Sequence, residues 1–283
     1  MRLCRPFLLI PLLLPLPLLP AQERADAPLP NIPDLVHEVQ EHQRQLDKVR
    51  ESYTYSAVQV TQDIDSSGQV KKTETEERDD FFVNGHVIER IVQKNGQPLS
   101  GRDEQKETER VSRMVEKAEK TPPGQPLDGT GITVSRLLQI MDVRNPRREM
   151  YRGRPAIVFD FVGRKDAKTH GLAEDASKKL KGTVWIDEAD RQVAHLEVSF
   201  DDNFRIAGGL FASIAKGSSF RFDQAPVQDG LWLPSGGEGT VQARLLLLKN
   251  VRQRFTERDF DYKRFKVQTQ QSKDTRLLPA GTQ

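Results

Sequence analysis

Residues 181–200, KGTVWIDEADRQVAHLEVSF, contain two runs of alternating side chains separated by a short polar turn. The first run ends at Asp187, and residues 188–191 supply the turn. A period of two is typical of strands that have one apolar face. The stretch predicts a β-hairpin whose second strand has an apolar face (Ala194, Leu196, Val198 and Phe200) and a mainly polar face (Val193, His195, Glu197 and Ser199).

The chain before this hairpin shows the same alternation. Strand-like residues begin at Ser52, and Asp65-Ser66-Ser67-Gly68 predicts a first turn. Asn84-Gly85 is the strongest short signal for a second hairpin turn. Residues 52–94 are therefore expected to form a three-stranded antiparallel meander.

Three segments have helical spacing instead. Apolar residues recur every three or four positions over about 33–50, which predicts an amphipathic helix. Residues 101–120 are highly charged, with a narrow apolar stripe (Val111, Met114, Val115 and Ala118), and predict a surface helix. A short helix is expected within 132–141. Together the last two make a helical insertion of about residues 101–142.

The remaining chain returns to strands joined by short turns. Strands are predicted near 156–164, 204–206, 218–224, 231–248 and 251–267, and 171–180 as a loop with one or two helical turns. Short connections imply antiparallel neighbours. The predicted fold class is α+β, mainly β: one strongly curved antiparallel sheet of about 10–11 strands, a half-open barrel, with helices covering its concave side.

The N-terminal segment differs from the rest. Arg2 and Arg5 precede an apolar run over 7–19, and Ala21 is a small residue at which a signal peptidase could cut, which predicts a secretory signal peptide over 1–21. Cleavage after Ala27 is an alternative. A membrane anchor is disfavoured because prolines interrupt a run shorter than about 20 residues. Residues 22–33 are expected to be a linker, and 268–283 a disordered tail.

Composition excludes several classes. The one cysteine, Cys4, precedes the apolar run, which argues against lipidation, a disulfide framework and a cysteine-based metal site. Removal of residues 1–21 leaves 41 basic side chains, equal to the 41 acidic ones. This balance argues against nucleic acid as the partner.

Catalytic and metal-binding patterns are weak. His37 and His42 resemble a zinc motif, but their spacing places them about 140° apart around a helix. The other histidines are scattered. The acid pairs Asp79-Asp80 and Asp201-Asp202 are expected to be solvated strand ends, because adjacent strand residues point to opposite faces. We expect no catalytic residue, metal or cofactor.

Arginines form two groups. One spans residues 144–164, and the other comprises Arg252, Arg254 and Arg258 on one predicted strand face. The second group is a candidate for binding an anionic headgroup or an acidic partner. The alternative is a solvated face paired with nearby acids.

Three stretches carry a family resemblance: YTYSAVQV to FFVNGHVIERIVQKNGQPLS (53–100), KGTVWIDEADRQVAHLEVSF (181–200), and FRIAGGLFASIAKGSSFRF (204–222) with LWLPSGGEGTVQARLLLL (231–248). Over most of residues 50–265 the chain resembles the LolA-like, outer-membrane lipoprotein-sorting proteins. The resemblance implies a half-barrel domain, here 34–267, with a helical lid and a cavity for acyl chains.

The resemblance further implies a non-enzymatic periplasmic protein of a Gram-negative bacterium, with at most peripheral or transient membrane contact. Its expected ligand is the acyl chain of a lipid or lipoprotein, as in lipoprotein sorting. The alternative is an envelope sensor or interaction module that binds a protein partner. The candidate cavity residues are Leu196, Val198, Phe200, Phe220, Phe222, Leu231 and Leu233, with Trp185 as a gate. The alternative for each is that it packs the core beneath the helices.

Overall fold

The computed structural model describes residues 28–123, 125, 127, 134–206, 208, 212–227, 231–246 and 249–264. The predicted signal peptide, linker residues 22–27 and the predicted tail lie outside these ranges. Within the described residues, no helix combines the length and the apolarity that a membrane crossing requires.

Within the described ranges most elements are strands, and four helices lie among them. The helices are α1 (Ile32–Arg50), α2 (Gly101–Lys120), α3 (Val134–Gln139) and α4 (Gly171–Ser177). The strands are β1 (Tyr53–Ile64), β2 (Val70–Val83), β3 (His86–Lys94), β4 (Gln97–Pro98), β5 (Met141–Tyr151), β6 (Arg154–Gly163), β7 (Leu180–Asp187), β8 (Val193–Phe200), β9 (Phe204–Ile206), β10 (Ala212–Ile214), β11 (Ser219–Pro226), β12 (Trp232–Leu245) and β13 (Lys249–Arg264).

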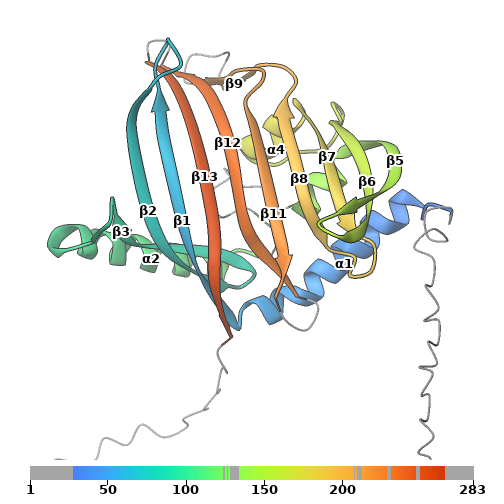
Figure 1. Ribbon diagram of the computed structural model, residues 1–283, viewed down its shortest axis with the longest axis horizontal. Helices are drawn as coiled ribbons and strands as arrows, with labels where there is room; N and C mark the ends of the chain where they lie inside the picture. Colours follow the sequence, from blue (N-terminus) through green and yellow to red (C-terminus); the bar gives the residue numbers. More distant parts are fainter. Residues whose placement is uncertain are drawn as a thin grey trace, which may run out of the picture.

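The thirteen strands of the described residues belong to one curved antiparallel sheet, which confirms the predicted fold class (Figure 1). The strand order is β4-β3-β2-β1-β13-β12-β11-β8-β7-β6-β5, and the short β9 and β10 attach beside β12. The sheet stays open, with β4 and β5 at its two ends. It has more strands than expected because β4 and β10, of two and three residues, are too short to show alternation.

The Asn-Gly pair that predicted a hairpin turn does form one in the structure. At the β2–β3 turn, Asn84 and Gly85 have φ angles of 50° and 75°, in the left-handed region that a type I′ turn requires. The predicted three-stranded meander is present as β1, β2 and β3. Pairing of β1 with β13 then joins the start and the end of the described chain in the middle of the sheet.

The main core lies between α1 and the strands β6, β7 and β8 (Figure 1). We call this face of the sheet the helix side and the other face the open side. Phe159, Val184 and Leu196 are cross-strand neighbours on the helix side, and Leu35 and Val39 of α1 belong to the same cluster. Burial of an aromatic side chain such as Phe159, which is fully buried, contributes roughly 1.5–3 kcal/mol.

Helix α2 lies beside the other end of the sheet, against β3 (Figure 1). The buried Glu107 carboxylate accepts a hydrogen bond from the Ile91 backbone N–H at 2.8 Å. Arg110 then pairs with Glu107 at 2.7 Å. The helix thus supplies hydrogen-bond partners to the part of β3 that the two-residue β4 does not cover, which protects that edge.

Candidate functional site

Five predicted cavity residues lie on the helix side of the sheet. Leu196, Val198 and Phe200 of β8 are buried in the cluster that α1 covers. Phe220 and Phe222 of β11 pack against the same cluster but are only partly buried. The β8 residues therefore pack the core, whereas the β11 pair lies where the helical cover ends.

The apolar face continues beyond β11. Phe220 pairs with Gly239 of β12, and Gly239 pairs with Phe255 of β13. A Cβ atom on Gly239 would lie 2.5 Å from the Phe255 ring, so the ring occupies the space that this glycine leaves empty. Phe204 and Ile214 also pack at the border of the core. We call Phe204, Ile214, Phe220, Phe222 and Phe255 the apolar strip.

Leu231 and Leu233 belong to a separate cluster. Both are fully buried with Tyr53, and Leu46 and Val49 from the C-terminal part of α1 pack on them. The structure does not bring these two leucines together with Leu196 or Phe222 in one cluster.

Trp185 lies on the open side, opposite the residues that it was expected to gate. It pairs with His195, whereas the neighbouring pair of Val184 with Leu196 faces the helices. The pairing register shifts by one residue between Trp185 and Ile186. This β-bulge also places Val193 in the core, whereas simple alternation had assigned it to the polar face.

His195 is the centre of a polar network that the sequence did not reveal. Its Nδ1 atom lies 2.8 Å from Asp223 Oδ1, and its ring stacks on Tyr151 with a centroid separation of 5.1 Å. Tyr151 donates to the same carboxylate at 2.6 Å, and Trp185 donates to Glu149 at 3.2 Å. Asp223 is 28 residues from His195 in sequence and reaches it only through the β8–β11 pairing.

The network changes the acid–base properties of its members. Burial lowers the pKa of His195, but the hydrogen bond and charge of Asp223 outweigh this effect and raise it. Burial raises the pKa of Asp223, and the hydrogen bonds from His195 and Tyr151 reverse that and lower it. The arrangement favours a charged His195–Asp223 pair.

A second charged cluster lies on the helix side of β1, β2 and β13. Arg78 is 5% exposed and contacts Glu257 at 2.6 Å, Gln59 at 2.9 Å and Asp80 at 3.7 Å. Asp80 is 2% exposed, so it is not the solvated strand end that was expected; only its neighbour Asp79 is exposed, on the other face. Alternation predicted the opposite faces but not which of them is covered.

Two carboxyls in this cluster are poorly satisfied. Both carboxylate oxygens of Asp259 lack a hydrogen-bond partner, and so does Oδ1 of Asp80. Burial raises the pKa of Asp80 to about 7, with Arg78 opposing and Glu89 and Glu257 adding to the rise. Burial and the Glu257 charge raise the pKa of Asp259 to about 7 as well. The pKa values of these two carboxyls therefore lie near neutral pH.

The predicted arginine row lies on the open side of β13. Arg252 pairs with Gln242, Arg254 with Thr240 and Arg258 with Gly236, and all three arginines are exposed. Arg258 lies over the Phe260 ring at 5.2 Å. The three side chains are thus solvated, and within the described part of the chain none of them forms an ion pair with an acid.

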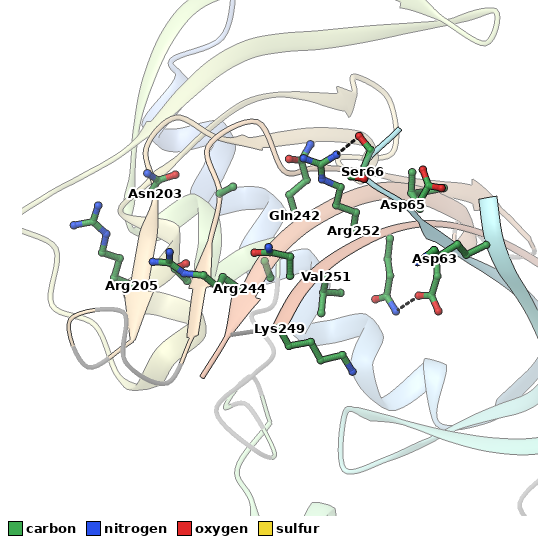
Figure 2. A pocket seen from close by; sticks show the side chains of 17 residues that line it. Asp63, Asp65, Ser66, Asn203, Arg205, Gln242, Arg244, Lys249, Val251 and Arg252 are labelled. Atoms are coloured by element: carbon green, nitrogen blue, oxygen red, sulfur yellow. Dashed lines mark hydrogen bonds between the residues drawn. The ribbon is translucent and has the colours of Figure 1, made fainter. Parts of the chain in front are cut away.

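Arg252 also lines a pocket of about 800 Å³ where the β1–β2 and β12–β13 hairpins end (Figure 2). The charged side chains around it are Asp63, Asp65, Lys71, Arg205, Arg244, Lys249 and Arg252. Basic groups thus outnumber acids by five to two. The sequence had indicated only Arg252 of this group, because the others come from short or separate strands.

The described residues contain no candidate metal-binding site. They contain no group of three or more His, Cys, Asp or Glu side chains that could hold a metal ion. His37 is exposed on α1, five residues from His42, as the spacing suggested.

Comparisons with known proteins give matches of fold alone. No protein-family model and no curated protein matches the chain. A solved domain of an outer membrane lipoprotein-sorting protein from Vibrio parahaemolyticus is 12% identical, with a TM-score of 0.39, over 84% of this chain and 95% of that one. Its name places it among the outer-membrane lipoprotein-sorting proteins, the group that the sequence resembles.

Two further solved structures are similar at the same low level. A DUF1329 family protein from Desulfovibrio piger is 10% identical, with a TM-score of 0.33, over 81% of this chain and 92% of that one. A chain of the MucA/MucB complex from Pseudomonas aeruginosa is 11% identical, with a TM-score of 0.24, over 80% of this chain and 99% of that one. Neither assigns a role to any residue here.

Proposed function

We propose that this chain is a non-enzymatic binding protein of the bacterial envelope that shelters an acyl chain of a lipid or lipoprotein. The observation that carries the proposal is the apolar strip, which extends the core beyond α1 and stays partly exposed on the helix side. An exposed apolar surface that is continuous with a core is typical of a binding site.

The strip has the chemistry that an acyl chain requires. Its side chains are aromatic or aliphatic, and the Phe255 ring packs over Gly239, next to Phe220 in the pairing register. Each methylene group buried contributes about 0.8 kcal/mol, so ten methylenes would contribute about 8 kcal/mol. This corresponds to a dissociation constant on the order of 1 μM.

The envelope location rests on the predicted signal peptide. An acyl chain is insoluble in the aqueous periplasm, so a protein that carries or senses one must cover it with apolar side chains. Outer-membrane lipoprotein sorting is the process that this chemistry and the resemblance of the sequence favour.

The direct test is mass spectrometry of the mature protein isolated natively from the periplasm. We expect lipid or acylated peptide in stoichiometric amount. In the F220S/F222S double variant we expect at least tenfold less, because two of the strip's rings are removed. The matched control is Met150→Ser, which changes a side chain that is 67% exposed on β5, away from the strip.

Folding of each variant is checked by circular dichroism. If the double variant unfolds, displacement of a fluorescent fatty acid from the wild-type protein by unlabelled palmitate replaces it. The proposal is overturned if the wild-type protein carries no lipid and does not bind the fatty acid, or if a folded double variant keeps its lipid.

A second candidate is an interaction module that binds a segment of an envelope protein. It is favoured by β5, which pairs only with β6 and so leaves one edge without a partner strand among the described residues. Extended peptides add to such edges. A lipid-free protein that copurifies with one envelope protein would favour this function.

A further inference from the structure

We propose that the pocket where the β1–β2 and β12–β13 hairpins end binds a phosphate group of an anionic ligand through Arg205, Arg244 and Arg252. The site is separate from the apolar strip and does not depend on the proposed acyl binding.

The register places two of the arginines on either side of one small residue. Ser213 of β10 pairs with Arg205 of β9 on one side and with Arg244 of β12 on the other. Paired residues of antiparallel strands point to the same face, and adjacent strands lie about 4.8 Å apart. The two arginine backbones are therefore about 10 Å apart with only a short hydroxyl side chain between them.

The third arginine lies one row further along the same face. Arg244 pairs with Asn250, and Arg252, two residues later on β13, pairs with Gln242. Figure 2 shows Arg205, Arg244 and Arg252 around the pocket, with Gln242 beside Arg252. The residues that pair with these arginines, Ser213, Asn250 and Gln242, have neutral hydrogen-bonding side chains, and the Arg252 guanidinium donates to the Ser66 carbonyl oxygen at 3.5 Å.

The acids that line the pocket are already occupied. Asp63 accepts a hydrogen bond from Gln253 Nε2 at 2.9 Å. Asp65 closes its own turn by accepting from Ser67 N and Gln69 N at 2.8 and 2.9 Å, and the hydrogen bond from the Ser67 hydroxyl lowers its pKa. Neither carboxylate forms an ion pair with the arginines across the pocket.

Several arginines elsewhere on this protein have acidic partners, whereas those of the pocket do not, within the part of the chain that the structure describes. Arg148 contacts Glu188 at 2.7 Å and Arg221 contacts Glu238 at 2.7 Å. The hydrogen bond from Lys179, at 2.8 Å, is the main cause that lowers the pKa of Asp202, and the charge of Arg205 adds a smaller effect. Among the described residues the three pocket arginines are left with no carboxylate partner.

Phosphate is the anion that this arrangement suits best. Guanidinium groups bind phosphate oxygens by paired, charge-assisted hydrogen bonds, and three of them can contact different oxygens of one group. The pocket, at about 800 Å³, is much larger than a phosphate ion. The ligand is therefore a phosphate ester with a polar remainder, which is either a soluble molecule or the headgroup of a lipid.

The test measures binding of two probes by the full mature chain: glycerol phosphate by calorimetry, and vesicles of phosphatidylglycerol by flotation with phosphatidylcholine vesicles as reference. We expect Arg244→Gln to weaken binding at least tenfold, since charge-assisted hydrogen bonds to phosphate are lost. The matched control is Arg221→Gln, which removes an arginine of the same face whose charge Glu238 already neutralises. It should change binding less than twofold.

The two arms separate the sources of the phosphate. Binding of glycerol phosphate indicates a soluble ester, and binding of phosphatidylglycerol vesicles alone indicates a lipid headgroup; either supports the site if Arg244→Gln abolishes it. The proposal is overturned if neither probe binds, if both arginine variants lose binding equally, or if a polyglutamate peptide binds more tightly than either probe. Because Arg221 and Arg244 are exposed, their substitution should leave the fold intact, and circular dichroism checks this.

Discussion

Replacement of Asp80 by asparagine should make this protein more stable at alkaline pH. The carboxyl is 2% exposed, one of its oxygens has no hydrogen-bond partner, and its pKa is raised to about 7 by burial against the pull of Arg78. Asparagine has the shape of the protonated acid and carries no charge. The variant therefore keeps the form of the side chain that the folded state prefers.

The magnitude follows from linkage between proton binding and folding. The unfolded chain releases this proton near its ordinary pKa of 3.8, and the folded chain near pH 7. Between these values the folded state holds more protons, so the free energy of unfolding falls by about 1.4 kcal/mol per pH unit as the pH rises. The full loss above pH 7 is about 4 kcal/mol, and stability is unaffected below pH 3.8.

The assay is urea unfolding followed by circular dichroism at pH 5, 6, 7 and 8. We expect Asp80→Asn to be more stable than the wild-type protein by about 4 kcal/mol at pH 8 and by less at each lower pH. Asp259, with a pKa of about 7, keeps its own contribution, so the slope is reduced and not abolished.

The control is Asp79→Asn, one residue away on the exposed face, which should leave the pH profile unchanged. The reasoning is refuted if Asp80→Asn is less stable than the wild-type protein at pH 8. In that case the charge of Asp80 stabilises Arg78 by more than its burial costs.

Three other substitutions test the packing and the polar network. Phe159→Ala should lower the free energy of unfolding by about 3–5 kcal/mol in urea, because it empties a fully buried site under α1. Gly182→Ala should cost at least about 2 kcal/mol in the same assay, since its Cβ would lie 2.0 Å from the Glu197 carbonyl oxygen. Asp223→Asn should lower the pKa of His195 in an NMR titration; the stability that the charged pair contributes is lost as the pH rises through the folded pKa of His195, and also as the pH falls through the lowered pKa of Asp223.

Local signals in the sequence predicted much of the sheet. The Asn84-Gly85 turn, the α2 helix of residues 101–120 and the strand of residues 86–94 are where they were expected. Such features depend on a few neighbouring residues, whose propensities and spacing can be seen directly. The position of Leu196 on the apolar face is of the same kind.

Features that depend on pairing register could not be predicted. The shift at Trp185 reverses which residues face the helices, and a bulge leaves no clear mark in the sequence. His195 meets Asp223, and Arg244 faces Ser213, only because strands that are not consecutive in sequence pair in a particular register. Asp80 looks like any other surface acid until the cover over its strand is known.

The way α1 is held indicates where a ligand would lie. Glu38 of the helix contacts Arg191 at 3.3 Å at a largely exposed site, and such a pair contributes at most about 1 kcal/mol. Leu46 and Val49 pack on the second cluster. Four further apolar residues of the helix are buried in the main core: Ile32, Leu35, Val36 and Val39. At roughly 1.5–3 kcal/mol each these contribute about 6–12 kcal/mol, comparable with the whole stability of a typical domain.

A ligand that displaced α1 would have to replace that entire contribution, whereas one that lies beside the helix does not. The partly buried Phe220 and Phe222 border the helical cover, and Phe255 extends the apolar surface away from it. We therefore expect an acyl chain to bind along the strip, with α1 in place, rather than beneath the helix against Leu196 and Val198. Addition of fatty acid should accordingly slow hydrogen exchange at the backbone amide of Phe222 and leave exchange within α1 unchanged. Faster exchange in α1 would show instead that the helix is displaced.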